Sequence, residues 1–510
     1  MAPLKKPAHS ATQPAVQILR AMLGQAEFHP HLPQQRRLYE AARTAILQQQ
    51  LPARSKLPST RSVAGELGIA RNTVIAAFKQ LAAEGYVSAT GGSGTFVAKT
   101  LPDESLFDTP LRDDGGTAVA AADHEPGQLS RRGEQLTAFA AGERFEIQPF
   151  APGDPDFSLF PQKLWQRIQN RVWRDARPEL LDYGQAGGYL PLRSAIAEYL
   201  QASRSVKVSL EQVMITSGTQ QSLDLCAQML ADVGDTAWVE DPCYWAARRV
   251  FQSCDLRLHP VAVDGEGIAP GEADLATQPK LIYVTPSHQY PTGVVMTLAR
   301  RRRLLDIAAA KRAWILEDDY DSEFRYSGRP LAALQGLDTY GRVVYMGTFS
   351  KILYPGIKVG YLVVPPALVE PFKTALYDLQ RPGQMMVQAA LADFMSLGHF
   401  ATHIRKIRLA YGAKRETLRK TLMAQMGGGI GISGEDSGLH LVVELPDHVD
   451  DVALEKLAAE SGIAVKALST YYQARTPRRG LLVGYAYVAP GKIAYYAKLL
   501  TKIIRAGTRK

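Results

Sequence analysis

Predicted strands and helices alternate along the chain from Phe150 to about residue 365, and this alternation limits the possible folds more than any other feature. Short apolar runs that are typical of buried strands are separated by longer segments with helical spacing. Such alternation favours a mostly parallel sheet with helices on both of its faces. Open sheets of this kind bind their ligands beyond the carboxyl ends of the strands. Functional residues are therefore expected in the segments that directly follow the apolar runs.

Lys351 follows one of these runs, 343–350, and a second apolar run begins at Val359. A lysine between two buried strands can lose much of its hydration, and burial in general lowers the pKa of an ammonium group. An amine in such a place can act as a nucleophile and form a Schiff base. For a single lysine, a solvent-exposed position in a hairpin loop would be the ordinary alternative. Three further segments favour the Schiff-base interpretation.

Acidic residues crowd the end of another apolar run, 313–316, which leads directly into Glu317, Asp318, Asp319 and Asp321. Neighbouring carboxylates repel each other and lose hydration when they are buried, so such a group is costly unless it holds a ligand. A carboxylate at this place can pair with the protonated ring nitrogen of pyridoxal phosphate. The spacing alone does not decide whether Asp318 or Asp319 faces the ring.

A turn with small and hydroxyl side chains, 217–220, lies between a predicted strand and a predicted helix over 221–231. Free backbone N–H groups and the positive end of a helix bind phosphate well, although any capped helix shows the same local pattern. Tyr244 follows the predicted strand 236–239 and can stack on a ring or simply belong to the core. Together the four segments supply the amine, carboxylate, phosphate site and aromatic ring that pyridoxal phosphate needs.

The first hundred residues carry a separate pattern. After an amphipathic helix, two short predicted helices meet around a glycine turn at Gly68, and Arg71, Asn72 and Thr73 open the second of them. Two short strands are predicted next, over 86–89 and 94–97. This is the layout of a winged helix-turn-helix, although a helical bundle with a hairpin would look similar.

Charge favours the DNA-binding interpretation. Residues 1–99 hold twelve Lys and Arg against four Asp and Glu, so this fifth of the chain carries +8 of the total net charge of +9. A basic load on a small helix-turn-helix domain attracts the phosphate backbone of nucleic acid. The remainder of the chain is close to neutral.

The composition is that of an ordinary globular protein, with 46% hydrophobic and 21% charged residues. Three cysteines without metal-ligand spacing predict a reducing, cytoplasmic location and no metal site. No segment predicts a membrane span or a signal peptide. Residues 1–33 are expected to form a flexible arm. Residues 100–145 are expected to form a linker, in which 128–141 can fold into one short helix.

With these motifs, the chain resembles the MocR/GabR group of bacterial regulators, in which a GntR-type winged helix-turn-helix is fused to a domain with the fold of type I aminotransferases. The matching segments are LPSTRSVAGELGIARNTV and GSGTFV in the first part, and PGDPDFSLFP, ITSGTQQSLDL, EDPCY, TPSHQYPTG, EDDYDSEF and GTFSK in the second. The resemblance implies a winged helix-turn-helix over 34–99 and an aminotransferase-like α/β domain over 146–510. The second domain would have a mostly parallel sheet and a smaller C-terminal α/β subdomain.

The resemblance also implies roles for individual residues. Lys351 would form the internal aldimine of pyridoxal phosphate, and Asp318 would pair with the ring nitrogen. Tyr320 would hydrogen-bond the ring oxygen, and Tyr244 would stack on the ring. The phosphate would be held by Ser217, Gly218, Thr219, Thr348, Ser350 and Lys358. DNA would be bound by Arg61, Arg71, Asn72, Thr73 and Gly94.

The chain departs from the family at two places. Lys358 stands seven residues after Lys351, where an arginine is usual, and lysine lacks the two-pronged guanidinium group. The arginine that usually clamps a substrate carboxylate just before the last core strand is absent from 481–486. Arginines occur only earlier, at Arg475, Arg478 and Arg479.

We therefore expect a transcription regulator that senses a small amine or amino acid through an aldimine at Lys351, with weak or no transaminase turnover. A working aminotransferase that also carries a DNA-binding domain is the alternative. The expected partners are a double-stranded DNA operator, the small effector, and a second copy of the chain in a homodimer.

Overall fold

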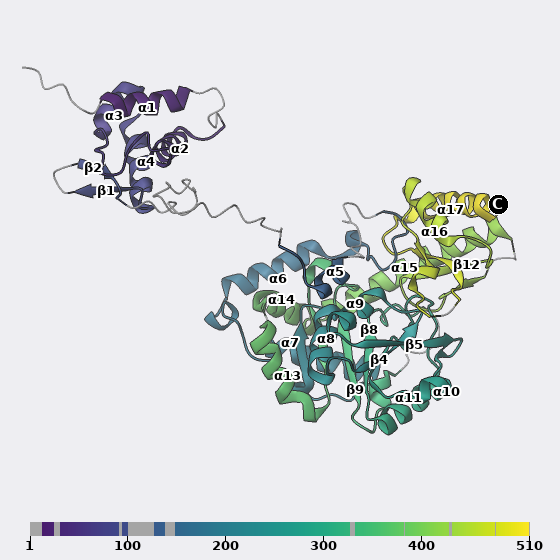
Figure 1. The fold of residues 1–510 in the computed structure, drawn as a ribbon. Coiled ribbons are helices and arrows are strands. Elements are labelled where there is room, and N and C mark those ends of the chain that lie inside the picture. Colours follow the sequence, from purple (N-terminus) through teal and green to yellow (C-terminus); the bar gives the residue numbers. More distant parts are fainter. Residues whose placement is uncertain are drawn as a thin grey trace, which may run out of the picture. The chain divides into compact units, whose positions relative to one another are not determined.

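The computed structural model describes residues 13–24, 31–90, 94–99, 127–137, 148–326, 332–381, 383–427, 431–474 and 476–508. The chain divides into two compact units, Met1–Gly127 and Gln128–Lys510. Figure 1 shows the elements of each unit, coloured along the sequence. Among the described residues, every helix is too short or too polar to cross a membrane.

Helices and one hairpin make up the described part of the first unit. They are α1 Gln13–Gly24, α2 Gln34–Leu47, α3 Thr60–Leu67, α4 Arg71–Ala83, β1 Val87–Thr90 and β2 Gly94–Val97. Helix α3 begins at Ser59, whose hydroxyl accepts a 3.1 Å hydrogen bond from the Ser62 N–H. It ends at Gly68, whose φ of 69° is left-handed, a conformation that glycine adopts without steric cost. The turn predicted between the two short helices is therefore present.

Helix α1 lies inside the segment that was expected to form a flexible arm. Val16 and Leu19 are buried in the core of the first unit, where α1 contacts α2 and α3. The proline, glutamine and alanine content of the segment suggests weak order. However, apolar side chains at three- and four-residue spacing give α1 one face that can be buried. The expectation of an arm is wrong for these twelve residues.

An eight-stranded sheet forms the centre of the second unit, in the order β3-β10-β9-β8-β7-β4-β5-β6. The five strands from β9 to β5 pair in parallel, whereas β10 is antiparallel to both of its neighbours and β6 is antiparallel to β5. This confirms the predicted, mostly parallel sheet. The strands are β3 Val213–Thr216, β4 Thr236–Asp241, β5 Arg257–Asp264, β6 Gly267–Ile268, β7 Pro279–Val284, β8 Trp314–Asp319, β9 Val343–Thr348 and β10 Gly360–Val363.

Helices cover both faces of this sheet. Successive strand residues point to opposite faces, and Ile315 and Leu316 of β8 accordingly lie in two different apolar cores. Leu316 packs in the core that α8 and α9 share, and Ile315 packs in the core that contains α11. The helices up to this point are α5 Arg131–Thr137, α6 Gln162–Arg174, α7 Leu190–Arg204, α8 Thr219–Leu230, α9 Trp245–Ser253, α10 Glu272–Leu275, α11 Leu298–Lys311 and α12 Leu334–Leu337.

A smaller antiparallel sheet and its helices close the chain, which confirms the predicted C-terminal subdomain. Its strand order is β11-β12-β14-β13. In Figure 1, this sheet lies with α16 and α17 beside the large sheet. The elements are α13 Val369–Ala375, α14 Met385–Ser396, α15 His399–Met426, β11 Ile432–Ser433, β12 His440–Leu445, α16 Asp451–Glu460, β13 Lys466–Ala467, β14 Arg479–Gly484 and α17 Ile493–Thr508.

Helix α5 lies within the segment that was expected to form a linker, where one short helix was anticipated over 128–141. It contacts α9, and Arg132 of α5 forms a salt bridge with Asp255, just after α9. This end of the segment therefore belongs to the second unit.

Candidate functional site

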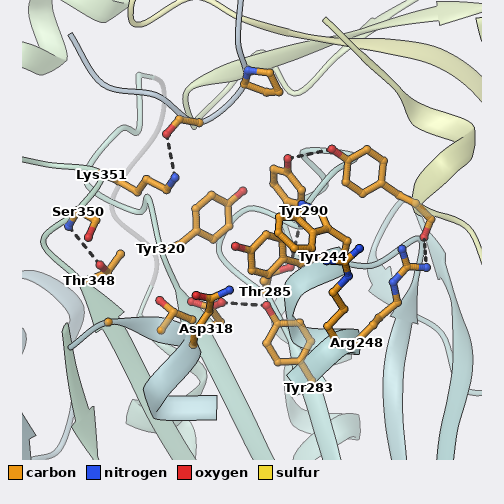
Figure 2. A pocket seen from close by; sticks show the side chains of 18 of the residues that line it. Tyr244, Arg248, Tyr283, Thr285, Tyr290, Asp318, Tyr320, Thr348, Ser350 and Lys351 are labelled. Carbon is orange, nitrogen blue, oxygen red and sulfur yellow. Dashed lines mark hydrogen bonds between the residues drawn. The ribbon is translucent and has the colours of Figure 1, made fainter. Parts of the chain in front are cut away.

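A cavity of about 1490 Å³ lies at the carboxyl ends of the parallel strands of the second unit. The segments that follow β3, β4, β7, β8 and β9 form part of its wall, together with β12 and loops of the C-terminal subdomain. Figure 2 shows a close view of the lining side chains. The ten predicted cofactor residues all line this cavity: Ser217, Gly218, Thr219, Tyr244, Asp318, Tyr320, Thr348, Ser350, Lys351 and Lys358. The structure therefore brings them together, and their individual roles stay predictions.

Asp318 faces the cavity from the end of β8. Its Oδ2 accepts a 2.8 Å hydrogen bond from the Tyr283 hydroxyl, whereas its Oδ1 is buried without a hydrogen-bond partner in the described structure. Burial raises the pKa of this carboxyl from 3.8 to about 7, because a charge is costly to keep away from water. A buried, unpartnered acceptor that faces a cavity fits the protonated ring nitrogen of pyridoxal phosphate.

Asp319, the next residue of β8, points to the opposite face of the sheet. Its Oδ2 lies 2.9 Å from the Arg204 Nε and accepts a 2.5 Å hydrogen bond from the Tyr345 hydroxyl. Asp319 Oδ1 also lacks a partner in the described structure, but Asp319 does not line the cavity. The geometry therefore favours Asp318 over Asp319 for the ring nitrogen, a choice that the sequence left open.

The Lys351 amine is held at the cavity wall by the backbone. Its Nζ donates a 2.9 Å hydrogen bond to the carbonyl oxygen of Gly153. Gly153 has a left-handed φ of 81°, and a Cβ at this position would lie 3.3 Å from the Lys351 Nζ. Glycine thus leaves room for the amine, and it joins the segment 148–156 to the loop that follows β9.

The predicted phosphate residues meet because of strand register. Gly360 of β10 pairs with Thr216 at the end of β3 and with Thr348 at the end of β9. The segments that continue from these two ends supply the turn before α8 and the loop that carries Ser350. A Cβ on residue 360 would lie 2.8 Å from the Gly218 Cα, so a glycine is needed for this close approach. The start of α8 adds free backbone N–H groups, which bind anions.

The cavity is also lined by aromatic side chains for which the sequence predicted no role, among them Tyr283, Tyr290, His440 and Tyr471. The Tyr290 ring lies 5.5 Å from the rings of Tyr244 and Tyr471, 5.4 Å from His440 and 5.9 Å from Tyr320, measured between centroids. The Tyr290 and Tyr471 hydroxyls are 3.2 Å apart. We call Tyr290, Tyr320, His440 and Tyr471 the aromatic wall.

His440 and Tyr320 are the neutral members of the aromatic wall for which burial fixes the protonation state. Burial lowers the pKa of His440 to about 3, so the imidazole is neutral, and its Nε2–H donates a 2.9 Å hydrogen bond to the Pro291 carbonyl. The pKa of Tyr320 is raised by burial and by the nearby Asp321 carboxylate, so its hydroxyl stays protonated. His288 Nδ1 lies 3.0 Å from this hydroxyl and 2.9 Å from Asp321 Oδ2, which orients Tyr320.

Four of the five predicted DNA-binding residues are exposed on the first unit. Arg61 is exposed in the first turn of α3, while Arg71 and Asn72 are exposed at the start of α4. Gly94 opens β2 with a φ of 117°, and a Cβ there would meet the side chain of Lys56. Lys56 is exposed and forms a β-bridge with Phe96, so it adds a basic side chain to the hairpin that the sequence analysis overlooked. Thr73 follows on α4 and is half-buried. DNA contact by these residues stays a prediction.

Comparisons with known proteins identify the family. Residues 34–97 match the model of bacterial regulatory proteins of the gntR family, and residues 149–482 match that of aminotransferase class I and II. The chain is 40% identical to the probable rhizopine catabolism regulatory protein MocR of Rhizobium meliloti over 463 residues, which cover 90% of this chain and 91% of that protein. This chain belongs to the MocR-type family of DNA-binding transcription regulators.

A further relative covers most of this MocR-type regulator, and a solved structure resembles three quarters of it. It is 31% identical to the HTH-type transcriptional regulator TauR of Rhodobacter capsulatus, over 90% of this chain and 94% of TauR. Among solved structures, it resembles the multiple substrate aminotransferase of Thermococcus profundus, with 27% identity and a TM-score of 0.68 over 75% of this chain and 98% of that one. These findings confirm a GntR-type winged helix-turn-helix joined to a fold type I domain.

Pyridoxal phosphate is the cofactor that this family implies. The residues fit it, because an amine, an unpartnered buried carboxylate oxygen and a helix start line one cavity. When bound, the cofactor supplies an aldehyde that condenses reversibly with primary amines. Lys351 would carry that bond, Asp318 would hold the ring nitrogen, and Thr219 with Ser350 would hold the phosphate.

Proposed function

We propose that this MocR-type regulator senses a small primary amine or amino acid at Lys351, and that binding of this ligand changes how its DNA-binding unit binds DNA. The carrying observation is that Asp318 and Lys351 line one cavity whose wall continues well past the cofactor residues, to Gln252 and Lys466. A cavity of about 1490 Å³ leaves space for a second small molecule beside the cofactor.

Sensing requires that the effector bind one arrangement of the protein better than another. An effector amine would compete with Lys351 for the bond to the aldehyde of the cofactor and would release the lysine amine. In this structure, the unreacted Lys351 amine contacts the Gly153 carbonyl oxygen. Gly153 precedes α6, and Lys351 follows the central strand β9. The released amine would be able to make this contact, so effector binding would join two segments of the second unit to each other.

A sensing role is favoured over full catalysis by the arginines near β14. Arg478 binds Glu444, and Arg479 Nη1 lies 3.2 Å from the buried Asp451 Oδ1. Neither arginine lines the cavity, and Arg475 lies outside the described residues. A working aminotransferase must hold the carboxylate of its substrate in a productive orientation. Arg478 and Arg479 are paired with Glu444 and Asp451 instead. The alternative, an active aminotransferase with a DNA-binding unit, draws support from the fold that it shares with such enzymes.

The DNA-binding half of the proposal rests on α4. Arg71 and Asn72 are exposed at its start, where a recognition helix meets base edges. A two-fold homodimer would present two such helices to paired half-sites of an operator. We place the protein in the cytoplasm, where its three free thiols stay reduced.

The test is an absorption titration of the cofactor-loaded protein with a panel of amines and amino acids, each followed by a keto acid. A sensor should show a ligand-dependent change of the cofactor band that stops before amino transfer. Conversion to the amine form of the cofactor, with turnover once a keto acid is added, would instead establish an enzyme. Lys351→Ala should lose the lysine-dependent band and keep its fold, as judged by circular dichroism.

A further inference from the structure

We propose that the second unit binds a small anion of the size of chloride in a cavity that is separate from the cofactor cavity. This second cavity has a volume of about 10 Å³. Two arginines and three serines line it in the described structure: Arg204, Arg325, Ser287, Ser322 and Ser437. We call it the arginine–serine cavity. The inference does not depend on the proposed function, because none of these five residues lines the cofactor cavity.

The arginine–serine cavity joins segments that are far apart in the sequence. Arg204 ends α7, and Ser287 lies in the loop that follows β7. Ser322 and Arg325 lie in the segment that follows β8. Ser437 precedes β12 of the C-terminal subdomain, and a β-bridge joins it to Arg325. A guest in this cavity would therefore hold the C-terminal subdomain against segments of the large sheet.

The wall of the arginine–serine cavity supplies hydrogen-bond donors. The Arg325 Nε and the Ser437 Oγ are buried without a hydrogen-bond partner in the described structure, and Ser437 is only 3% exposed. The Ser287 Oγ accepts a 2.7 Å hydrogen bond from the Arg204 Nη2, which leaves the Ser287 hydroxyl proton able to donate. Buried polar atoms are stable only when they are hydrogen-bonded. A guest that accepts hydrogen bonds would satisfy these donors.

Charge favours an anion over a water molecule as this guest. The Arg204 Nε lies 2.9 Å from the Asp319 Oδ2, so these two charges offset each other. Arg325 has no carboxylate partner in the described structure, and the nearby Glu323 accepts a 2.8 Å hydrogen bond from the Tyr199 hydroxyl. A buried guanidinium without a counter-charge is costly. A water molecule would satisfy the hydrogen bonds, whereas an anion would also offset the charge of Arg325.

The size of the cavity selects among anions. A water molecule needs about 10–15 Å³, so a cavity of about 10 Å³ accepts one guest of roughly atomic size. Phosphate, sulfate and carboxylates have several heavy atoms and are too large. Chloride is monatomic and only slightly larger than a water molecule, so it is the common anion that fits.

Thermal unfolding of the cofactor-loaded full chain tests the proposal. The cofactor fills the phosphate site, so chloride does not act there. Chloride is varied from about 1 mM to about 200 mM, and sodium gluconate, whose anion is too large for the cavity, keeps the ionic strength constant. We expect the unfolding midpoint to rise with chloride, by about 3 °C when chloride reaches a hundred times its dissociation constant.

A serine variant tests where chloride binds. Ser437→Ala removes a hydrogen bond to a charged guest, so the dissociation constant for chloride, taken from the same titration, should rise about tenfold or more. Ser433→Ala is the matched control, because Ser433 lies on β11 of the same subdomain but does not line the cavity. This control should respond to chloride as the wild type does.

Diffraction from crystals grown in bromide gives a second measurement that needs no variant. The anomalous signal of bromide should lie within hydrogen-bonding distance of Arg325 and Ser437. A midpoint that stays constant when chloride replaces gluconate would overturn the inference, as would a chloride response that Ser437→Ala retains in full. If Ser437→Ala fails to fold, the bromide signal decides: a peak in the arginine–serine cavity supports the inference, and its absence overturns it.

Discussion

Replacing Asp318 with asparagine should change two properties of the protein in opposite directions. In the cofactor-free protein, burial raises the pKa of the Asp318 carboxyl from 3.8 to about 7. Between these pH values, the folded chain keeps a proton that the unfolded chain has released, so stability falls as the pH rises. Above pH 7, the folded state bears the full cost of the buried charge. Asparagine removes that cost, so Asp318→Asn should stabilise the cofactor-free protein above pH 7 but not near pH 4.

The size of the effect follows from the same pKa. The difference between 3.8 and about 7 corresponds to at most about 4 kcal/mol, at 1.36 kcal/mol per pKa unit. The asparagine NH2 group would have no acceptor at the Oδ1 position, which costs about 1–3 kcal/mol. A net gain of about 1–3 kcal/mol would raise the unfolding midpoint of a unit of roughly 380 residues by about 1–4 °C.

The same substitution should weaken cofactor binding. A hydrogen bond to a charged partner contributes about 1.5–3 kcal/mol, so the dissociation constant for pyridoxal phosphate should rise about 10- to 150-fold. Thermal unfolding of the cofactor-free wild-type and variant proteins from pH 4 to pH 9, and a fluorescence titration with the cofactor, measure the two effects. A variant that is no more stable than wild type at pH 8 would refute the reasoning that Asp318 is an unpaired, buried carboxylate.

Three further substitutions test other parts of the structure. Gly360→Ala should weaken cofactor binding, because its Cβ would lie 2.8 Å from the Cα of Gly218 in the predicted phosphate turn. Gly356→Ala is the control, because its Cβ would lie 3.7 Å from its nearest neighbour. Equal affinities of the two variants for the cofactor would argue against the close approach at Gly360. Arg71→Ala should cost about 1–3 kcal/mol of DNA-binding free energy, and unchanged binding in fluorescence anisotropy would remove α4 from the interface. Asp319→Asn should destabilise the protein by about 3–5 kcal/mol, because it leaves the buried Arg204 without its carboxylate; an unchanged unfolding midpoint would contradict this.

Local sequence patterns were sufficient to predict those site residues that lie just after the end of a strand. Lys351, Asp318 and Ser217 each come shortly after an apolar run. Because the carboxyl ends of parallel strands meet at one edge of a sheet, those residues had to converge. The winged helix-turn-helix was equally predictable from the sequence, because the Ser59 cap and the Gly68 turn depend only on residues within one or two helical turns.

The remainder of the site depends on contacts between distant segments. The choice between Asp318 and Asp319 is made by Arg204, which comes from a helix far earlier in the chain. His440 and Tyr471 reach the cavity only because the C-terminal subdomain packs beside the large sheet, and no local spacing encodes that packing. Helix α1 was missed although its signal is local. Its composition suggests weak order, but the regular spacing of its apolar residues gives it one face that is buried.

The most direct test of the central claim is the affinity for DNA of the full-length, cofactor-loaded protein, with and without a bound amine. The DNA is selected by the protein itself from a randomised pool, and binding is followed by fluorescence anisotropy. Wild-type protein should change its dissociation constant about 5- to 150-fold when a ligand found in the absorption titration is added, whereas Lys351→Ala should bind the same DNA without responding. An equal affinity of the wild type in both conditions would contradict a sensor that acts on DNA through Lys351.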